Sequence, residues 1–240
     1  MKQHKALILV PCCKKKTVVP STEVVSALPG LPVLREKLLE AIKITPVLKE
    51  KEENRKGILD PEAAISRAID LYCGRFYNQA EDLLRALAGG QVTNVNVLIV
   101  SAFYGLVLPH EGIKEYELLM SDTLSSGMKI YRYWQDCGLW EILQDYIKRN
   151  KISHVWSLLP NSRPKFPYQH VFKQFWGKAG DYGVSCFHVR VPGARTSTGY
   201  QRARWLGEVM SSDPGLLVNP EKMPSEWSNT PGYRFEYISC

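Results

Sequence analysis

Four short apolar runs, separated by segments of helical periodicity, constrain the fold of this chain most strongly. The runs are KALILVP (5–11), VNVLIVSAFYGLV (95–107), HVWSLLP (154–160) and VSCFHVRVP (184–192). Such runs are typical of strands that are buried on both faces of a parallel sheet. Helical periodicity is found at 34–42, 61–88, 128–150 and 200–210. The alternation predicts an α/β fold with a central, mostly parallel sheet of about four strands and helices on both faces.

The length of 240 residues fits a single α/β domain over 1–240. Residues 43–60 carry a run of charges, which predicts an exposed loop. Residues 211–240 are rich in Pro, Ser and Asn and have no period. We therefore expect an irregular C-terminal tail that wraps the surface.

The chain is basic, with 31 Lys and Arg against 24 Asp and Glu, a net charge of +7. This balance suits a polyanionic partner such as nucleic acid. No stretch approaches the ~18 uncharged apolar residues of a membrane span, and the N-terminal apolar run is too short for one and lacks a cleavage site. We expect a cytoplasmic protein without a membrane partner, and a monomer.

Cysteine spacing argues against a metal centre. The six cysteines form no C-x-x-C pair, and no His lies at ligand-like spacing from them. We predict reduced thiols, no metal site and no cofactor.

The first apolar run ends in the sequence PCCKKK, which places Lys14, Lys15 and Lys16 just beyond a strand. Ligands of open α/β sheets bind outside the carboxyl ends of the strands. The three lysines are therefore predicted to contact phosphates, which fixes position without reading sequence. The alternative is that they only solvate a turn.

Two further basic segments follow later runs, NSRPKFPYQH (161–170) and GARTSTGYQRARWL (193–206). The first supplies Arg163 and Lys165. The second supplies Arg195 and Ser197 before a helix, where an N-terminus binds phosphate readily. Helix capping by Ser197 or Thr198 is the alternative. Together with the three lysines, these residues are predicted to form one electropositive face that binds DNA.

Four pieces in the same order carry a resemblance to known proteins: LVPCCKKK (9–16), LYCGRFYNQA (71–80), VLIVSAFYGLVLPHEGIKEYELLM (97–120) and VPGARTSTGYQRARWL (191–206). The chain resembles a group of small bacterial domains that includes the peroxide-stress YaaA family, and it is similar to a domain of archaeosine synthase. The resemblance implies a fold shared with the uracil-DNA glycosylases.

What the resemblance implies for function is either DNA binding in a stress response or excision of a base. Bacterial defence glycosylases that remove glucosylated bases from phage DNA look similar in fold. This chain has no G-x-D-P-Y loop and no H-P-S-P motif, which argues against uracil as the substrate. The expected substrate is a modified base in phage DNA, such as glucosylated hydroxymethylcytosine, whose removal leaves an abasic site.

Hydrolysis of an N-glycosidic bond needs a carboxylate that activates water or stabilises the sugar cation. Three acidic residues follow the SAFYGL turn and are the catalytic candidates, in the order Glu117, Glu111 and Asp122. Glu117 comes first because it matches the acidic position of the motif I-x-x-Y-[DE]. The alternative is that these are loop acids that pair with the basic surface. Lys14 as a nucleophile would need a depressed pKa.

A glycosylase holds its extruded base in a pocket lined by aromatic and polar groups. The candidates are Cys12, Ser101, Phe103, Tyr104, Tyr72, Phe76 and Tyr168, with Tyr77 beside them. Core packing is the alternative for the aromatic rings. Gly105 is predicted to occupy a turn that needs positive φ or a close backbone approach.

Three functions therefore remain open. The first is a DNA glycosylase that acts on modified bases, and the second is a non-catalytic DNA-binding stress protein. The third is a nucleosidase for small molecules. The acidic residues favour the first and third, and the net charge favours the first two.

Overall fold

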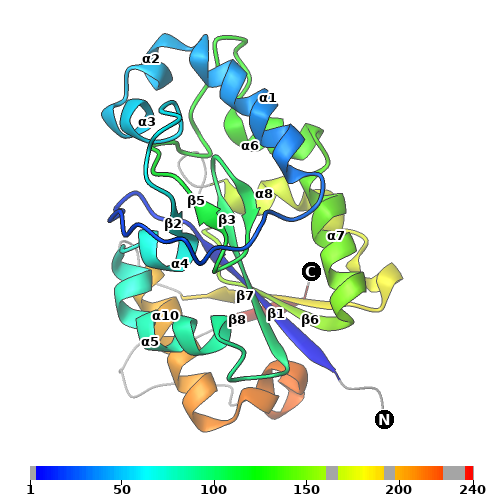
Figure 1. Cartoon of the computed structure of the whole chain (residues 1–240). Coiled ribbons are helices and arrows are strands. Elements are labelled where there is room, and N and C mark those ends of the chain that lie inside the picture. Colours follow the sequence, from blue (N-terminus) through cyan, green and yellow to red (C-terminus); the bar gives the residue numbers. More distant parts are fainter. Residues whose placement is uncertain (1–3, 161–166, 192–197, 224–235, 240) are drawn as a thin grey trace.

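The protein forms an α/β structure around one six-stranded sheet (Figure 1). The computed structural model describes residues 4–160, 167–191, 198–223 and 236–239. The strand order is β4-β3-β1-β6-β7-β8. The strands of this sheet are β1 (Lys5–Pro11), β3 (Val95–Ser101), β4 (Gly105–Val107), β6 (Ile152–Ser157), β7 (Ser185–Arg190) and β8 (Glu236–Ser239). A separate antiparallel pair consists of β2 (Ser66–Arg67) and β5 (Gly112–Ile113).

The four central strands, β3, β1, β6 and β7, run parallel to one another. This confirms the predicted α/β class and its mostly parallel sheet. Strands β4 and β8 run antiparallel to their neighbours at the two edges. The run 95–107 therefore gives two strands, β3 and β4, joined by a tight turn. The C-terminal segment, expected to be irregular, contributes β8 to the sheet.

Strand β1 occupies the middle of the sheet, between β3 and β6. Every side chain from Ala6 to Val10 is completely buried. Because β1 has parallel neighbours on both edges and no exposed face, its sequence is continuously apolar, as parallel-sheet strands are. Its carboxyl end is therefore flanked by the ends of two other strands.

Helices account for most of the connections between the strands. They are α1 (Leu31–Lys43), α2 (Pro46–Lys49), α3 (Glu52–Lys56), α4 (Ala68–Leu71), α5 (Arg75–Ala88), α6 (Ile130–Asp136), α7 (Leu139–Asn150), α8 (Tyr168–Val171), α9 (Lys173–Trp176) and α10 (Thr198–Ser212). Short 3-10 turns cover Ala179–Tyr182, Pro214–Val218 and Pro220–Lys222.

The charged segment 43–60 is not an exposed loop, and that prediction was wrong. It contains α2 and α3, and it buries Leu48 and Asn54. Pro46 starts α2, where its missing N–H has no cost. The long helical segment 128–150 divides into α6 and α7 at Gly138. The φ of Gly138 is +72°, which is incompatible with a right-handed α-helix.

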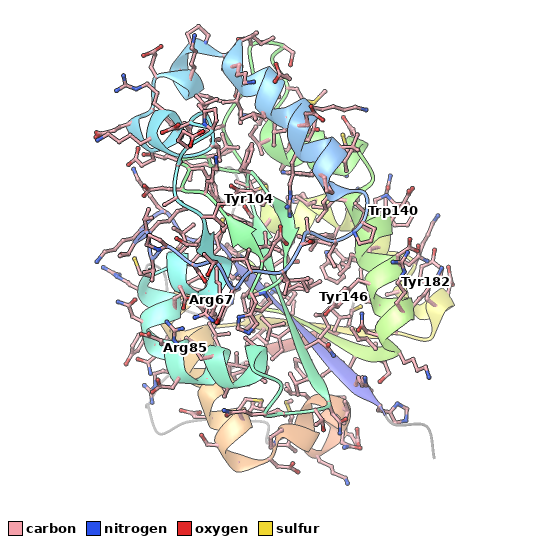
Figure 2. The ribbon with its side chains drawn as sticks, viewed as in Figure 1. Arg67, Arg85, Tyr104, Trp140, Tyr146 and Tyr182 are labelled. Carbon is pink, nitrogen blue, oxygen red and sulfur yellow. The ribbon has the colours of Figure 1, made fainter. Side chains whose placement is uncertain are left out.

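The helices flank the sheet, as predicted. Helices α5 and α10 pack against each other on one side, and α7 lies on the other (Figure 1). Trp156 on β6 packs against Trp205 of α10, with ring centroids 5.4 Å apart. Figure 2 shows Tyr104 inside the molecule, whereas Tyr182 lies at the outer margin near α7.

A buried polar cluster ties α8 and α10 to the sheet. His188 on β7 lies within hydrogen-bonding reach of the Gln169 side chain and, at 3.1 Å, of the Ser157 carbonyl. Arg202 of α10 donates to the carbonyls of Val189 (2.9 Å) and Leu158 (3.1 Å). Arg202, which belongs to the basic segment 193–206, is thus a buried structural residue.

The environment of His188 predicts acid lability. Burial, and then the positive charge of Arg202, lowers the pKa of His188 to about 3 from the ordinary value of 6.5. The folded protein therefore binds the proton less readily than the unfolded chain does. The stabilising effect of the neutral ring is complete above pH 6.5 and is lost as the pH falls towards 3. The loss is on the order of 4–5 kcal/mol.

We expect His188→Asn to flatten the fall in unfolding free energy between pH 6.5 and 3, although it lowers stability at pH 7. Urea unfolding at a series of pH values measures this. His110→Gln is the matched control, because His110 is only half-buried. An acid limb of the same depth in His188→Asn would contradict the prediction.

Candidate functional site

Motif residues that are distant in sequence meet at the carboxyl ends of β1 and β3. The amide of Cys12 donates to the carbonyl of Val100 at 2.9 Å, which continues the pairing of the two strands. Beyond it, the amide of Thr17 donates to the carbonyl of Leu71 at 2.9 Å. The lysine segment therefore lies alongside the start of LYCGRFYNQA, so two of the sequence motifs meet at this site.

A chain of hydroxyl groups fills the centre of this region. The Tyr116 hydroxyl lies 2.7 Å from Ser101 Oγ and 2.9 Å from the Tyr72 hydroxyl. The Tyr168 hydroxyl lies 3.2 Å from Cys12 Sγ. Burial raises the pKa of each of these tyrosines well above its ordinary value. The hydroxyls therefore remain protonated and act as hydrogen-bond donors and acceptors.

The structure brings together Cys12, Ser101, Tyr72 and Tyr168, all of which were predicted to bind substrate. Tyr116 was missed as a candidate, although it is the invariable Tyr of the pattern I-x-x-Y-[DE] immediately before Glu117. Its position in the chain could have identified it, because Tyr116 follows the SAFYGL turn and directly precedes the candidate acid Glu117.

The three consecutive lysines have different environments. Lys14 and Lys15 are exposed, and Lys16 is half-buried. Lys16 Nζ lies 4.2 Å from the centroid of the Tyr116 ring and 5.9 Å from that of Tyr72. Burial lowers the pKa of Lys16, whereas hydrogen bonding to Glu117 raises the pKa of Lys14. The depressed pKa that a nucleophilic amine needs therefore belongs to Lys16 and not to Lys14.

Cys13 also lies beside this segment. Its Sγ accepts from the amide of Gly74 at 3.3 Å, at the start of α5. Burial raises the pKa of Cys13 to about 12, so its thiol is protonated and unreactive at neutral pH.

Like Asp122 (20%) and unlike the buried Glu111, Glu117 has a partly exposed side chain (22%). Its carboxylate pairs with Lys14 at 3.0 Å, and its backbone is clamped by the buried Asn54, which accepts from the Glu117 amide at 2.8 Å. Burial raises the pKa of Glu117, but the hydrogen bond from Lys14 is among the effects that outweigh it and bring the pKa below its ordinary value. Glu117 is therefore ionised at neutral pH, at a strand-end site, next to an exposed cation.

The other two acids have structural contacts. Glu111 is buried, pairs with Arg35 and accepts from the amide of Leu108 at 3.2 Å. Asp122 accepts from the amide of Leu119 at 3.0 Å and pairs with Lys51 at 2.9 Å. Glu111 and Asp122 therefore fit the alternative interpretation, in which the acids of this loop pair with basic residues.

The predicted stacking rings are packed into the core. Phe103, Tyr104 and Phe76 are all less than 10% exposed (5%, 8% and 6%). Phe103 packs edge-on against Tyr104 with centroids 4.7 Å apart, and the Tyr104 hydroxyl accepts from the amide of Lys114 at 2.8 Å. Core packing, the alternative considered for these rings, describes their contacts.

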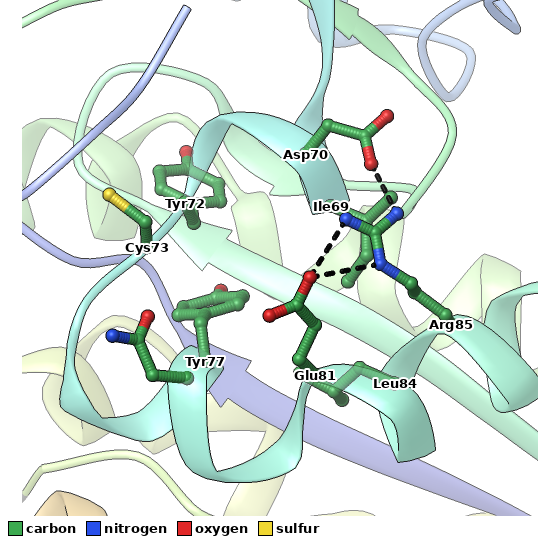
Figure 3. A pocket seen from close by; sticks show the side chains of 9 residues that line it. Ile69, Asp70, Tyr72, Cys73, Tyr77, Glu81, Leu84 and Arg85 are labelled. Carbon is green, nitrogen blue, oxygen red and sulfur yellow. Dashed lines mark hydrogen bonds and ion pairs between the residues drawn. The ribbon is translucent and has the colours of Figure 1, made fainter. Parts of the chain in front are cut away.

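A small pocket lies next to Tyr72, between α4 and α5 (Figure 3). Its volume of about 60 Å³ is that of roughly two water molecules. Arg85 pairs with Asp70 and with Glu81, and Arg67 pairs with Asp70 at 2.5 Å. The charged side chains around this pocket are thus paired with one another, and the pocket has no room for a nucleotide.

Four predicted phosphate contacts, Arg163, Lys165, Arg195 and Ser197, lie outside the described residues. Among the residues that the structure describes, no group of three or more His, Cys, Asp or Glu side chains could hold a metal ion. In the same part of the chain, no helix is long and apolar enough to cross a membrane.

Comparison with known families identifies the class of this protein. The family model of the peroxide stress protein YaaA matches residues 11–176, more than half of the chain. The match covers the lysine segment, the SAFYGL turn, Glu117 and Tyr168. The chain therefore belongs to the peroxide stress protein YaaA family. No curated protein matches it.

The SAFYGL turn depends on Gly105, as predicted, because its φ is +70°. A Cβ at this position would lie 3.0 Å from Leu139 and 3.1 Å from the Trp134 ring. We expect Gly105→Ala to lower the unfolding free energy by about 1–2 kcal/mol for the left-handed backbone, plus a further loss from crowding.

Gly127→Ala is the matched control for this prediction. Gly127 has a φ of +82° but no atom within 4 Å of its Cβ position, so its substitution has only the backbone cost. Denaturant unfolding of both variants separates the two contributions. Equal losses in the two variants would show that the turn has room for a side chain.

Proposed function

We propose that this chain is a DNA-binding protein of the peroxide stress response. The family supports the stress-response role. The observation that carries the DNA-binding role is the set of exposed cations at the carboxyl ends of the parallel strands. Lys14 and Lys15 are exposed there, and Arg75 is exposed at the start of α5.

These cations belong to one surface. The amide of Cys73 donates to the carbonyl of Lys15 at 3.2 Å, so Arg75, two residues further along the chain, lies near the lysine segment. Helix α5 begins after Gly74 without a side-chain cap, and the positive end of its dipole adds to the field. A surface of this kind suits a phosphate backbone, which is recognised by charge and not by base sequence.

Neutralising this surface should weaken DNA binding uniformly across sequences. We expect Lys14→Ala and Lys15→Ala each to flatten the slope of log affinity against log salt by about one unit. Fluorescence anisotropy with a labelled duplex at several salt concentrations measures the slope.

Arg149→Ala is the control for charge alone. Arg149 is exposed at the end of α7, just before β6 begins. It therefore lies at the amino ends of the parallel strands, opposite the carboxyl ends that carry the lysines. Its substitution should leave the slope unchanged. Slopes equal to that of the wild type in both lysine variants would remove these residues from the DNA contact.

A second candidate function is hydrolysis of an N-glycosidic bond in modified DNA, such as phage DNA with glucosylated cytosine. Glu117 supports it, because its carboxylate is ionised, partly exposed and next to the exposed Lys14, whereas Glu111 is buried and Asp122 accepts from a backbone amide of its own loop. An ionised carboxylate can stabilise the sugar cation as the C1′–N bond breaks, or accept a proton from the water that attacks C1′. The attacking water supplies the hydroxyl group to C1′ and, directly or through the carboxylate, the proton to the departing base.

Glu117→Gln should separate chemistry from binding. The variant keeps the shape and should retain its affinity for DNA, or bind slightly more tightly, because Lys14 is released from its ion pair. Excision should fall by on the order of 10²–10⁴-fold. Abasic sites in phage DNA with hydroxymethylated or glucosylated cytosine, probed in EDTA, give the rate.

Asp122→Asn is the control for a nearby acid with a structural contact, and it should change stability more than excision. If the wild-type chain leaves every modified and damaged DNA intact, the hydrolase function is excluded and the DNA-binding proposal stands by itself.

A further inference from the structure

A second pocket lies where α6 packs against α8. Its volume is about 240 Å³, slightly below the roughly 300–1,000 Å³ of pockets that enclose a drug-sized ligand. It therefore suits a small ligand that is only partly enclosed. The lining residues are Lys129, Tyr131, Arg132, Gln135, Pro167, His170 and Lys173.

Among the residues that the structure describes, the lining of this pocket is basic and contains no carboxylate. Lys129 Nζ donates to the carbonyl of Ser121 at 3.2 Å, and Arg132 donates to the side chain of Gln135 at 2.8 Å. Both acceptors are neutral. Within the described residues, no ion pair includes Lys129, Arg132 or Lys173. All three side chains are exposed, and an anionic ligand would bind to them by charge-assisted hydrogen bonds.

An aromatic ring lies beside these cations. Tyr131 is half-buried, its centroid is 6.4 Å from the His170 ring, and the Arg132 guanidinium lies 5.5 Å from the centroid. Aromatic side chains next to positive charge are the usual platform for a nucleobase, because every base has a π-face. Cations and an aromatic ring, the two elements that a nucleotide site needs, thus line one cavity.

Helix α8 connects this pocket to the site at the end of β1. Tyr168 contacts Cys12, while Pro167 and His170 line the pocket. The amide of Tyr131 donates to the carbonyl of Met120 at 3.0 Å, which ties α6 to the segment that follows Glu117. The pocket is therefore adjacent to the candidate site and distinct from it.

We propose that this pocket binds one nucleotide unit, with its phosphate among Lys129, Arg132 and Lys173 and its base against Tyr131. The unit is either a free mononucleotide or one residue of a nucleic-acid strand. The proposal goes beyond the DNA-binding surface described above, since Lys14 and Lys15 do not line the pocket.

Isothermal titration calorimetry tests the pocket with four probes: inorganic phosphate, deoxyadenosine, deoxyadenosine monophosphate and a short single-stranded oligodeoxynucleotide. The monophosphate or the oligonucleotide should bind more tightly than phosphate or the nucleoside. The Arg132→Gln, Lys173→Gln double variant should weaken that binding about tenfold or more. Tightest binding of the monophosphate identifies a free nucleotide, and binding of the oligonucleotide alone that the double variant weakens identifies a strand.

The ring is tested separately. Tyr131→Leu should weaken nucleotide binding by at least about fivefold without changing the affinity for phosphate. Tyr131→Phe should retain the wild-type affinity for the nucleotide. Lys14→Ala should not change mononucleotide affinity, so failure of the DNA-binding proposal and failure of this one are distinguishable. The assignment is overturned if the double variant binds both the monophosphate and the oligonucleotide like the wild type, or if Tyr131→Leu does so.

Discussion

The buried ion pair between Arg35 and Glu111 is the interaction on which the architecture around the site depends. The Arg35 guanidinium pairs with Glu111 and donates to the carbonyls of Tyr104 (2.8 Å) and Leu106 (2.9 Å). One side chain of α1 thereby holds the turn between β3 and β4 and the segment that follows it. With one partner removed, the other charge would be buried without compensation, which is strongly destabilising in proteins.

The position of that turn determines what lies at the end of β1. Because the turn is fixed, Ser101 and Tyr116 meet, and Tyr116 in turn reaches Tyr72 from the other side of the site. Glu117 follows Tyr116 directly, and the buried Asn54 clamps its backbone. The candidate acid is thus oriented by contacts that consist of backbone and neutral side chains. Its carboxylate remains available for Lys14 and for solvent.

Much of the fold was predictable because it depends on patterns that are local in the chain. The continuous apolar run from Ala6 to Val10 predicted a doubly covered parallel strand, and Gly105 predicted the positive φ of its turn. The segment 43–60 was misread because charge dominates its composition. Its two short helices are held by a few buried groups, such as Leu48 and Asn54, whose burial depends on segments far away in the sequence.

The sequence by itself determined the α/β class, the central parallel strands and the gathering of motif residues at the strand ends, since periodicity and chain order are sufficient for these. Only the tertiary structure decided which of three adjacent lysines is half-buried and which of the three candidate acids is buried. Lys14 and Lys16 have identical chemistry, but burial against Tyr116 lowers the pKa of one, and an ion pair with Glu117 raises that of the other. The tertiary structure also brought Lys129, Tyr131 and Lys173 into one pocket. Solvation and charge pairing are set by neighbours in space, which the order of residues along the chain does not specify.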